Sequence, residues 1–271
     1  MEEKMIRTVY KEIVYYQFSH FPQSLVSHGF STRFGGVSKG PYGTMNLGIN
    51  SRDHDDLVLE NYHRFASVFD LTPDDLVLSD QTHSDQIKRV SSIDRGKGIV
   101  TRQDYSSIDG LVTNERGIGL VTHHADCVPL FFFDPENKAI GIAHSGWKGT
   151  LNSIGKKMVH KMNEEFSTNP RHVVAGIGPS IGPCCYEIGE DVAILFYNKL
   201  KGLSEYIKPL SEGKYLLDLW GLNKQQLIEA GVPGNNVVKT HRCTKCNSDE
   251  FYSHRVQGNL RGTLAGLIAL K

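Results

Sequence analysis

The sequence is poor in cysteine, has no excess of either charge and contains no long apolar run. Five cysteines, an odd number, lie in a chain of 271 residues, which is too long to need disulfide staples. We therefore expect reduced thiols that are free for metal binding or nucleophilic chemistry. Thirty basic and thirty acidic residues cancel, which argues against nucleic acid as a partner. No stretch reaches the roughly 20 apolar residues of a membrane span, and the first residues do not resemble a signal peptide. These absences predict a cytoplasmic protein that binds no membrane.

Internal repeats, low-complexity segments and a recognisable linker are also missing, so we expect a single domain over residues 1–271. Short apolar runs predict strands, and apolar residues at steps of three and four predict helices. Strands outnumber helices, and several look hairpin-connected. This pattern favours an α+β fold with mixed sheets covered by helices over a doubly wound parallel sheet. The predicted strands are Ile13–Phe18, Leu76–Leu78, Ile87–Val90, Gly119–Thr122, Val128–Phe133, Ala139–Ala143 and Val173–Ile177, and the predicted helices are Asp56–Phe69, Gly149–Phe166, Glu190–Leu200 and Asp218–Ala230.

Two of the predicted strands flank a turn-forming segment, residues 134–138, and carry a cysteine and a histidine. If the hairpin is centred between Pro135 and Glu136, Cys127 lies directly opposite His144. Opposed residues of an antiparallel pair have Cβ atoms about 5 Å apart, close enough to share a metal ion. The spacing therefore predicts that Cys127 and His144 face each other across the ladder.

A third metal ligand has to come from another segment. His83 is the best candidate because it lies in a polar loop directly after a predicted strand. One thiolate and two imidazoles suit zinc, and three protein ligands leave the open coordination position of a catalytic site. We therefore predict a zinc site formed by His83, Cys127 and His144, with the adjacent Asp126 as a candidate proton carrier.

Alternative interpretations of the same residues stay open at this point. His123 and His124 compete as ligands, and His123 is the stronger rival because in a strand it shares the face of Cys127. Cys127 could also be a small buried apolar residue. A third possibility is a cysteine hydrolase or amidase, in which Cys127 is the nucleophile and His144 its base, oriented by Asp126 or another polar residue.

A second possible metal motif is the Cys-x-x-Cys pair formed by Cys243 and Cys246. Structural zinc usually needs a matching second pair, and the adjacent Cys184 and Cys185 match poorly. We therefore favour a loop near the active site, of redox-sensitive character, over a second zinc site.

Basic residues beside glycines indicate anion-binding loops. Arg33 precedes the pair Gly35-Gly36, where a backbone can approach a ligand closely, and its guanidinium can hold a phosphate or carboxylate. Lys148 follows the candidate ligand His144 and precedes a predicted helix, so it could hold an anion near the metal. The glycines of residues 176–183 lack the G-x-G-x-x-G spacing, which excludes a Rossmann interpretation.

Taken together, the motifs resemble a family once labelled multicopper polyphenol oxidases or laccase-domain proteins, of the YfiH-like type. Members of this family are now regarded as purine nucleoside phosphorylases with adenosine deaminase activity. The oxidase label fits poorly, because multicopper oxidases need repeated His-x-His ligands and the sequence has none. The matching segments are residues 27–38, 46–48, 81–83, 109–113, 125–129, 143–149, 178–187, 218–220 and 243–255.

The resemblance implies α/β/β/α layers and a zinc ion held by the residues predicted above. It also implies phosphorolysis of adenosine, inosine and methylthioadenosine, and hydrolytic deamination of adenosine. The protein would then bind purine nucleosides and inorganic phosphate, and it would be a monomer or a homodimer. Candidate substrate-binding residues are Arg33, Asn46, Lys148 and Arg255.

Overall fold

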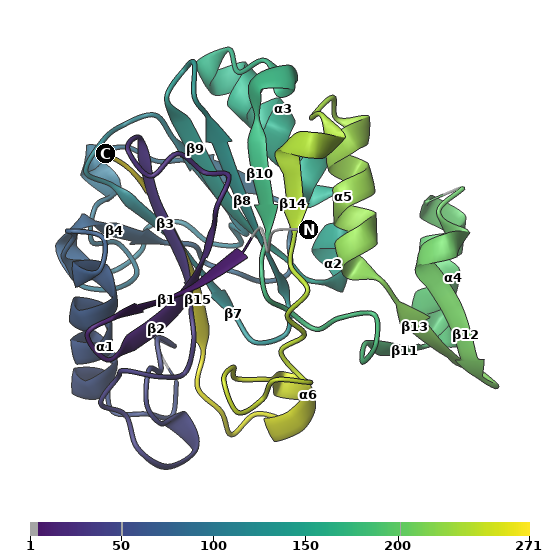
Figure 1. The fold of residues 1–271 in the computed structure, drawn as a ribbon, viewed down its shortest axis with the longest axis horizontal. Coiled ribbons are helices and arrows are strands. Elements are labelled where there is room, and N and C mark those ends of the chain that lie inside the picture. The colour runs from purple at the N-terminus through teal and green to yellow at the C-terminus, as the bar shows by residue number, and fades with distance from the viewer. Residues whose placement is uncertain (1–4, 50, 201) are drawn as a thin grey trace.

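The computed structural model describes residues 5–49, 51–200 and 202–271, and most of its strands form two six-stranded sheets (Figure 1). The pairs β4–β7, β5–β6 and β10–β14 are parallel, and the other neighbours are antiparallel, so both sheets are mixed. The first sheet has the order β1 (Met5–Tyr10), β2 (Ile13–Phe18), β3 (Val26–Ser31), β15 (Leu264–Leu270), β7 (Gly119–His124) and β4 (Leu76–Leu78). The second has the order β14 (Val237–Lys239), β10 (Val174–Ile177), β8 (Val128–Asp134), β9 (Ala139–Ser145), β6 (Gly110–Thr113) and β5 (Ile87–Arg89).

The two sheets pack face to face, which explains why central strands are apolar on both sides. All seven residues of β8 are buried. Phe131 and Phe133 belong to the core between the sheets, whereas Leu130 and Phe132 belong to the core beneath the helices. A strand covered on both faces needs a continuous apolar run rather than an alternating one.

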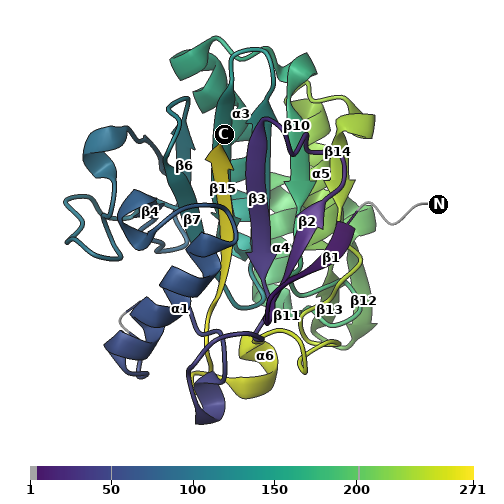
Figure 2. The same cartoon turned by 60° about the vertical axis from the view of Figure 1, so that its left-hand side comes forward.

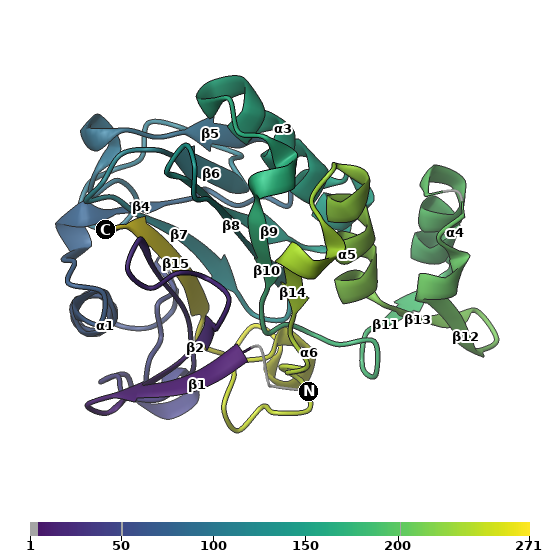
Figure 3. The same ribbon diagram turned by 45° about the horizontal axis from the view of Figure 1, so that its top comes forward.

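Helices cover the outer faces of both sheets and complete the predicted α/β/β/α order (Figures 2 and 3). Helix α1 (Asp55–Ser67) packs on the first sheet, and α3 (Ile154–Phe166) and α5 (Leu219–Glu229) pack on the second. A small third sheet, β11 (Glu187–Gly189), β13 (Lys214–Leu217) and β12 (Ile207–Ser211), lies beside α4 (Glu190–Lys199), and two short helices are α2 (Trp147–Leu151) and α6 (His254–Gln257). Among the described helices, none combines the length and apolar character that a bilayer crossing requires.

Every predicted strand is present, with bounds within two residues of those expected. One predicted helix, Gly149–Phe166, is wrong, because the structure has α2 and α3 with a break at Ser153, whose φ is 57°. The apolar spacing runs unbroken across this break and so could not reveal it. The side-chain amide of Gln226, from α5, donates to the Thr150 carbonyl at 2.8 Å. The same carbonyl accepts from the Ser153 amide at 3.0 Å, so this carbonyl at the end of α2 has partners outside a continuous α-helix.

The predicted register of the β8–β9 hairpin is also wrong. His144 lies opposite Pro129, not opposite Cys127. The carboxylate of Asp134 accepts hydrogen bonds from the backbone amides of Glu136 and Asn137, at 2.9 and 3.3 Å, which centres the turn one residue later than expected. The pairing is therefore shifted by two residues. A shift of two leaves each side chain on its original face, so Cys127 and His144 still approach each other.

His28 is a buried histidine at the centre of the first sheet. Its Nε2 accepts a hydrogen bond from the Phe18 amide at 2.8 Å, its ring packs against Phe21, and its Nδ1 has no partner. Burial lowers the pKa of His28 to about 3. The folded protein therefore keeps this imidazole neutral at a pH where an unfolded chain protonates it.

We expect this residue to make the fold sensitive to mild acid. Its folded pKa is depressed, so its contribution to stability is complete above the unfolded pKa of about 6.5 and is lost as the pH falls from there toward 3. The free energy of unfolding should fall by about 2 kcal/mol between pH 7 and pH 5 on account of His28. Urea unfolding at both pH values should show a smaller fall for His28→Gln than for the wild type. The control is His63→Gln, at an exposed position of α1, and an equal pH dependence in all three proteins would contradict the prediction.

Candidate metal centre and its cavity

Three side chains from separate segments meet at one end of the two sheets. His83 follows β4, Cys127 lies between β7 and β8, and His144 lies near the end of β9. One ligand atom from each of the three lies within 4.8 Å of the others, and the distance from Cys127 Sγ to His83 Nε2 is 3.8 Å. The structure thus brings together the three residues that the sequence predicted as ligands, despite the wrong register.

A buried carboxylate, Asp109, holds the backbone of His83 and the side chain of His144. It accepts hydrogen bonds from the backbone amides of Thr82, His83 and Ser84 at 3.0, 3.2 and 2.8 Å, and from the Ser84 hydroxyl at 2.8 Å. His144 Nδ1 donates to the same carboxylate at 2.7 Å, so its Nε2 remains for a metal. These bonds hold His83 at a φ of 61°, a left-handed conformation that costs free energy in a residue other than glycine.

The geometry of the cluster fits a bound transition metal. For tetrahedral zinc with ordinary Zn–S and Zn–N bonds, the expected sulfur–nitrogen separation is about 3.6 Å, close to the observed 3.8 Å. A thiolate with two imidazoles suits zinc or copper. Gly146 leaves the space that the cluster needs, since a Cβ at that position would lie 2.8 Å from the His83 ring and 3.2 Å from Cys127 Sγ.

The charges in the cluster favour the thiolate form of Cys127, which is the form that binds metals. Burial alone would raise the pKa of this thiol, but the charge of His144 and hydrogen bonds from His144 and His83 lower it to about 6. Burial likewise opposes the positive charge of His144, but Cys127 and Asp109 outweigh it and raise the pKa of His144 to about 9. These two pKa values therefore favour a thiolate at Cys127 beside a positively charged imidazole at His144.

Both rival histidines lie outside the cluster because their ring nitrogens are engaged elsewhere. His123 Nε2 is 2.5 Å from the Tyr62 hydroxyl, and its ring also bonds to the backbone of Leu47. The two nitrogens of His124 contact the Thr122 hydroxyl at 2.8 Å and the Cys127 carbonyl at 3.1 Å. Burial lowers the pKa of both histidines. They support the walls of the site as neutral hydrogen-bonding groups.

A cavity of about 640 Å³ is lined by the three candidate ligands. Asp126 and Arg255, both predicted as site residues, line this cavity. Arg33, Asn46 and Lys148 are not among the described residues that line it. Other residues of the wall are Gly48, Ile49, Ser51, Leu78, Ser79, Asp80, Gln81, Gly98, Gln103, His123, His124, Ala125, Trp147, Ile181, Tyr186, His254, Arg261 and Thr263.

The three candidates outside the wall have other contacts. The guanidinium of Arg33 donates to the carbonyls of Gly43 and Ser248 and lies over the Tyr252 ring. Asn46 is buried and accepts from the amide of Thr263, a residue of the cavity wall, at 2.8 Å. Lys148 is exposed on α2. The substrate-binding role assigned to these residues stays a prediction, and Asn46 is placed to support the wall from behind.

Asp126 holds the segment beside Cys127 in place. One of its carboxylate oxygens accepts from the Thr244 hydroxyl at 2.6 Å. The other accepts from the Ser253 hydroxyl at 3.0 Å and from the Arg255 amide at 2.7 Å. Its φ is 83°. Asp126 therefore joins the Cys127 loop to the two segments that carry Thr244 and Arg255.

Sequence reasoning did not single out Asp109, Gln81 or Arg261 as site residues. Gln81 bonds through its amide to both backbone groups of His123, at 2.7 and 2.6 Å. Arg261 lines the cavity, burial lowers its pKa, and its Nε has no hydrogen-bond partner. No local pattern in the sequence indicates that an arginine such as Arg261 is buried. Asp109 stands directly before a strand-like run, and this position could have indicated a site residue.

Comparisons with known proteins place this site in a family. A family model described as a multi-copper polyphenol oxidoreductase laccase matches residues 27–271. The chain belongs to this family. A relative from Bacillus subtilis named purine nucleoside phosphorylase YlmD is 35% identical over 246 residues, covering 90% of this chain and 88% of its own. A purine nucleoside phosphorylase from Bacteroides thetaiotaomicron is 34% identical, covering 92% of this chain and 93% of its own.

Solved structures of family members share the whole architecture. The crystal structure of YlmD from Geobacillus stearothermophilus superposes with a TM-score of 0.91 at 32% identity, covering 98% of this chain and 99% of its own. A Bacillus licheniformis protein, YfiH, gives a TM-score of 0.90 at 34% identity and covers 97% of both chains. The predicted family and the predicted α+β fold are both confirmed.

The network around Asp109 leads to a prediction about metal affinity. Asp109→Asn keeps the shape of the side chain but removes the charge that orients His144. We expect the affinity for zinc to fall about 10–100-fold, measured by competition with a chromophoric chelator. The matched control is Asp134→Asn, another buried aspartate, at the turn of the β8–β9 hairpin and so at the opposite end of that hairpin from His144. Equal zinc affinity in Asp109→Asn and the wild type would contradict the role of this carboxylate.

Proposed function

We propose that this protein is a zinc-dependent purine nucleoside phosphorylase that also deaminates adenosine hydrolytically. Its substrates would be adenosine, inosine and methylthioadenosine, together with inorganic phosphate. The observation that carries the proposal is the cluster of His83, Cys127 and His144 at the wall of a cavity of about 640 Å³, a size that suits a small-molecule ligand. The names of the relatives support the choice of substrate.

Zinc is favoured over copper by the surroundings of the cluster. A copper site with two histidines and one cysteine is typically completed by a weak axial methionine, and methionine is absent from the described cavity wall. The sequence also has no His-x-His pair. Three protein ligands and an open side facing the cavity are the pattern of catalytic zinc. When bound, zinc would supply Lewis-acid polarisation at this wall.

The phosphate is best placed beside Arg255 and Arg261. Both residues line the cavity, and the Nε of Arg261 is a buried donor without a hydrogen-bond partner. Arginine binds phosphate through a planar set of donors, so an anion here would satisfy that group. Arg255 itself is positioned by Asp126, which accepts from its backbone amide at 2.7 Å.

The remaining wall would hold the nucleoside. Trp147 and Tyr186 offer aromatic surface for a purine ring, while Gln81 and Gln103 line the cavity from other segments. Gln81 is already bonded to the His123 backbone, so it is fixed before a substrate arrives. We assign to Asp126 a positioning role, because both of its oxygens accept hydrogen bonds within the protein.

A cysteine hydrolase remains the second candidate because Asp109, His144 and Cys127 are connected in the order of a catalytic triad. The orienting carboxylate would be Asp109 and not Asp126. Against this candidate, His83 also approaches the thiol, and a hydrolase has no need of a second imidazole there. Irreversible inactivation by a thiol-alkylating reagent in metal-free protein would favour the hydrolase.

The first test supplies zinc-loaded protein with adenosine, with and without phosphate, and separates the products by chromatography. We expect adenine and ribose 1-phosphate only when phosphate is present. Inosine should form in both reactions, and where phosphate is present part of it should be converted to hypoxanthine. His83→Ala should lose bound zinc and both products together. Unchanged adenosine in both reactions, with zinc present in the protein, would contradict the proposed function and favour the hydrolase.

The arginine assignment gives a separate prediction. Arg261→Met should raise the KM for phosphate at least about 10-fold, since it removes a charge-assisted interaction with the anion, and should leave the phosphate-independent formation of inosine nearly unchanged. Arg116→Met, at an exposed position between β6 and β7, is the matched control. A phosphate KM that is equal in Arg261→Met and Arg116→Met would exclude Arg261 from phosphate binding.

A further inference from the structure

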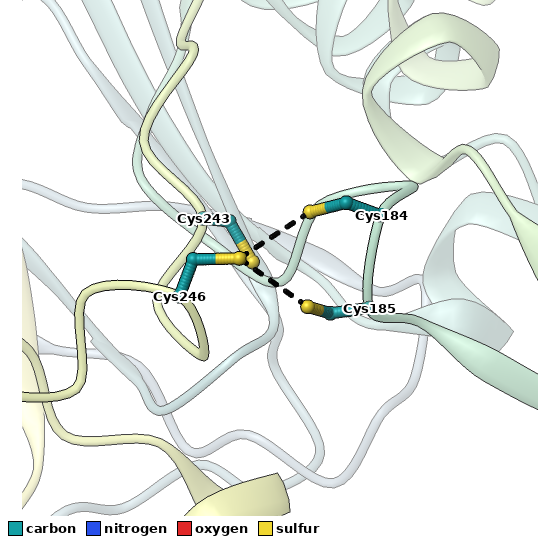
Figure 4. Close-up of side chains that lie close together, drawn as sticks. All are labelled: Cys184, Cys185, Cys243 and Cys246. Atoms are coloured by element: carbon teal, nitrogen blue, oxygen red, sulfur yellow. Dashed lines mark hydrogen bonds between the residues drawn. The ribbon is translucent and has the colours of Figure 1, made fainter.

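Four of the five cysteines form a second cluster, separate from the metal centre. Cys184 and Cys185 lie in the turn between β10 and β11, and Cys243 and Cys246 lie in the loop between β14 and α6. Their four sulfur atoms all lie within 4.8 Å of one another. Figure 4 shows the sulfurs of Cys184 and Cys185 pointing toward Cys246 from the opposite side of the cluster. From the sequence we did not expect the two cysteine pairs to share a metal site, but the folded loops bring them together.

We propose that this cluster is a structural zinc site with four thiolate ligands. Tetrahedral zinc with ordinary Zn–S bonds places sulfur atoms about 3.8 Å apart. The distances from Cys246 Sγ to the sulfurs of Cys184 and Cys185 are 3.6 and 3.4 Å. A disulfide would need about 2.05 Å and could join only two of the four sulfurs. A closed set of four protein ligands is the pattern of a structural zinc site and not of a catalytic one.

Local structure explains how adjacent cysteines can share one ion. The amides of Cys185 and Tyr186 both donate to the carbonyl of Gly182, at 2.9 and 3.0 Å, which closes the chain into a tight turn. Within this turn the two neighbouring side chains project to the same side (Figure 4). Consecutive residues of an extended strand would point in opposite directions. The turn therefore allows the adjacent Cys184 and Cys185 to form a ligand pair, which we did not expect from the sequence.

The second loop is built to present its pair. Asn247 donates its backbone and side-chain amides to the carbonyl of Cys243, at 3.1 and 2.8 Å, which forms a turn around the Cys-x-x-Cys segment. The Gly182 amide donates to the Cys243 sulfur at 3.2 Å, an interaction that favours a thiolate. Cys243 is buried, whereas Cys184 and Cys246 are exposed, so an ion could enter from solvent.

A metal here would fix one wall of the cavity. The first loop continues from Ile181 to Tyr186, and both residues line the cavity. In the second loop, Thr244 lies between the two cysteines and donates to Asp126, next to the ligand Cys127, at 2.6 Å. The site would therefore act as a clamp that holds two irregular loops against the metal centre without touching the substrate.

Metal content tests the proposal directly. Protein expressed with zinc and analysed by mass spectrometry of the metal should contain about two zinc ions per chain if both sites bind. Cys127→Ser, which removes a ligand of the first site, should retain about one ion. Cys184→Ser/Cys246→Ser, at the two exposed positions, should also retain about one, and the triple variant essentially none. If the double variant binds as much zinc as the wild type, the four-cysteine site does not exist.

These variants also separate this proposal from the proposed function. If only the first site failed to bind zinc, Cys127→Ser would equal the wild type and the double variant would be empty. Should the double variant not fold, Cys127→Ser alone decides the question. Loaded with cobalt(II), it should show the intense thiolate charge-transfer absorption of a tetrahedral thiolate site. A metal-free Cys127→Ser, or one whose mass is lower by two hydrogens because a disulfide has formed, would overturn the proposal.

Discussion

The candidate metal centre depends on the ionised carboxylate of Asp109. This group is fully buried, yet five donors from the loop after β4 and from His144 surround it. An unpaired buried carboxylate would be very costly, so the loop can satisfy Asp109 only in the conformation that places His83 beside His144. Burial opposes its charge, but the bonds from His144, Ser84 and Thr82 lower the pKa of Asp109 below its usual value. The same bonds offset the strained backbone of His83.

Asp126, a second buried carboxylate, holds the segment that carries Cys127 in place through hydrogen bonds, as Asp109 holds His83 and His144. Irregular segments cannot satisfy their backbone groups through a sheet ladder, so they need partners from elsewhere. The amide of Ile181 donates to the Asp126 carbonyl at 2.9 Å, and Thr244, Ser253 and the Arg255 amide donate to its side chain. The rigid part of the site is thus formed by two carboxylates at the ends of strands, while the apolar cores hold the sheets that carry them.

Much of the fold and the cluster of three candidate ligands could be predicted from sequence, because the strands and the residues beside them give local signals. Apolar runs such as β8 are long enough to be recognised as strands. A cysteine and a histidine beside two strands of one hairpin can then be expected to lie close together. The hairpin register was wrong because it depends on how Asp134 bonds to the turn, a detail that composition does not contain. The cluster survived this error because a shift of two residues preserves the faces of a strand. Arg33 shows the opposite limit: arginine beside glycines suits an anion site and a brace between loops equally well, and its contacts with the carbonyls of Gly43 and Ser248 could not be predicted from sequence.

The cysteines illustrate why long-range contacts decide chemistry that spacing leaves open. Cys127 lies among imidazoles at the edge of a cavity, where an ion held by this mixed set of side chains would have one side open to small molecules. Cys184, Cys185, Cys243 and Cys246 lie among one another, where every metal-binding group is a sulfur and the set is closed. The two environments are about as different as thiol sites can be, but they are joined through Thr244 and Asp126. A change in the geometry of the sulfur cluster would therefore move the segment that carries Cys127, so the position of the cavity-facing ligand depends on a cluster that contributes nothing to the cavity itself.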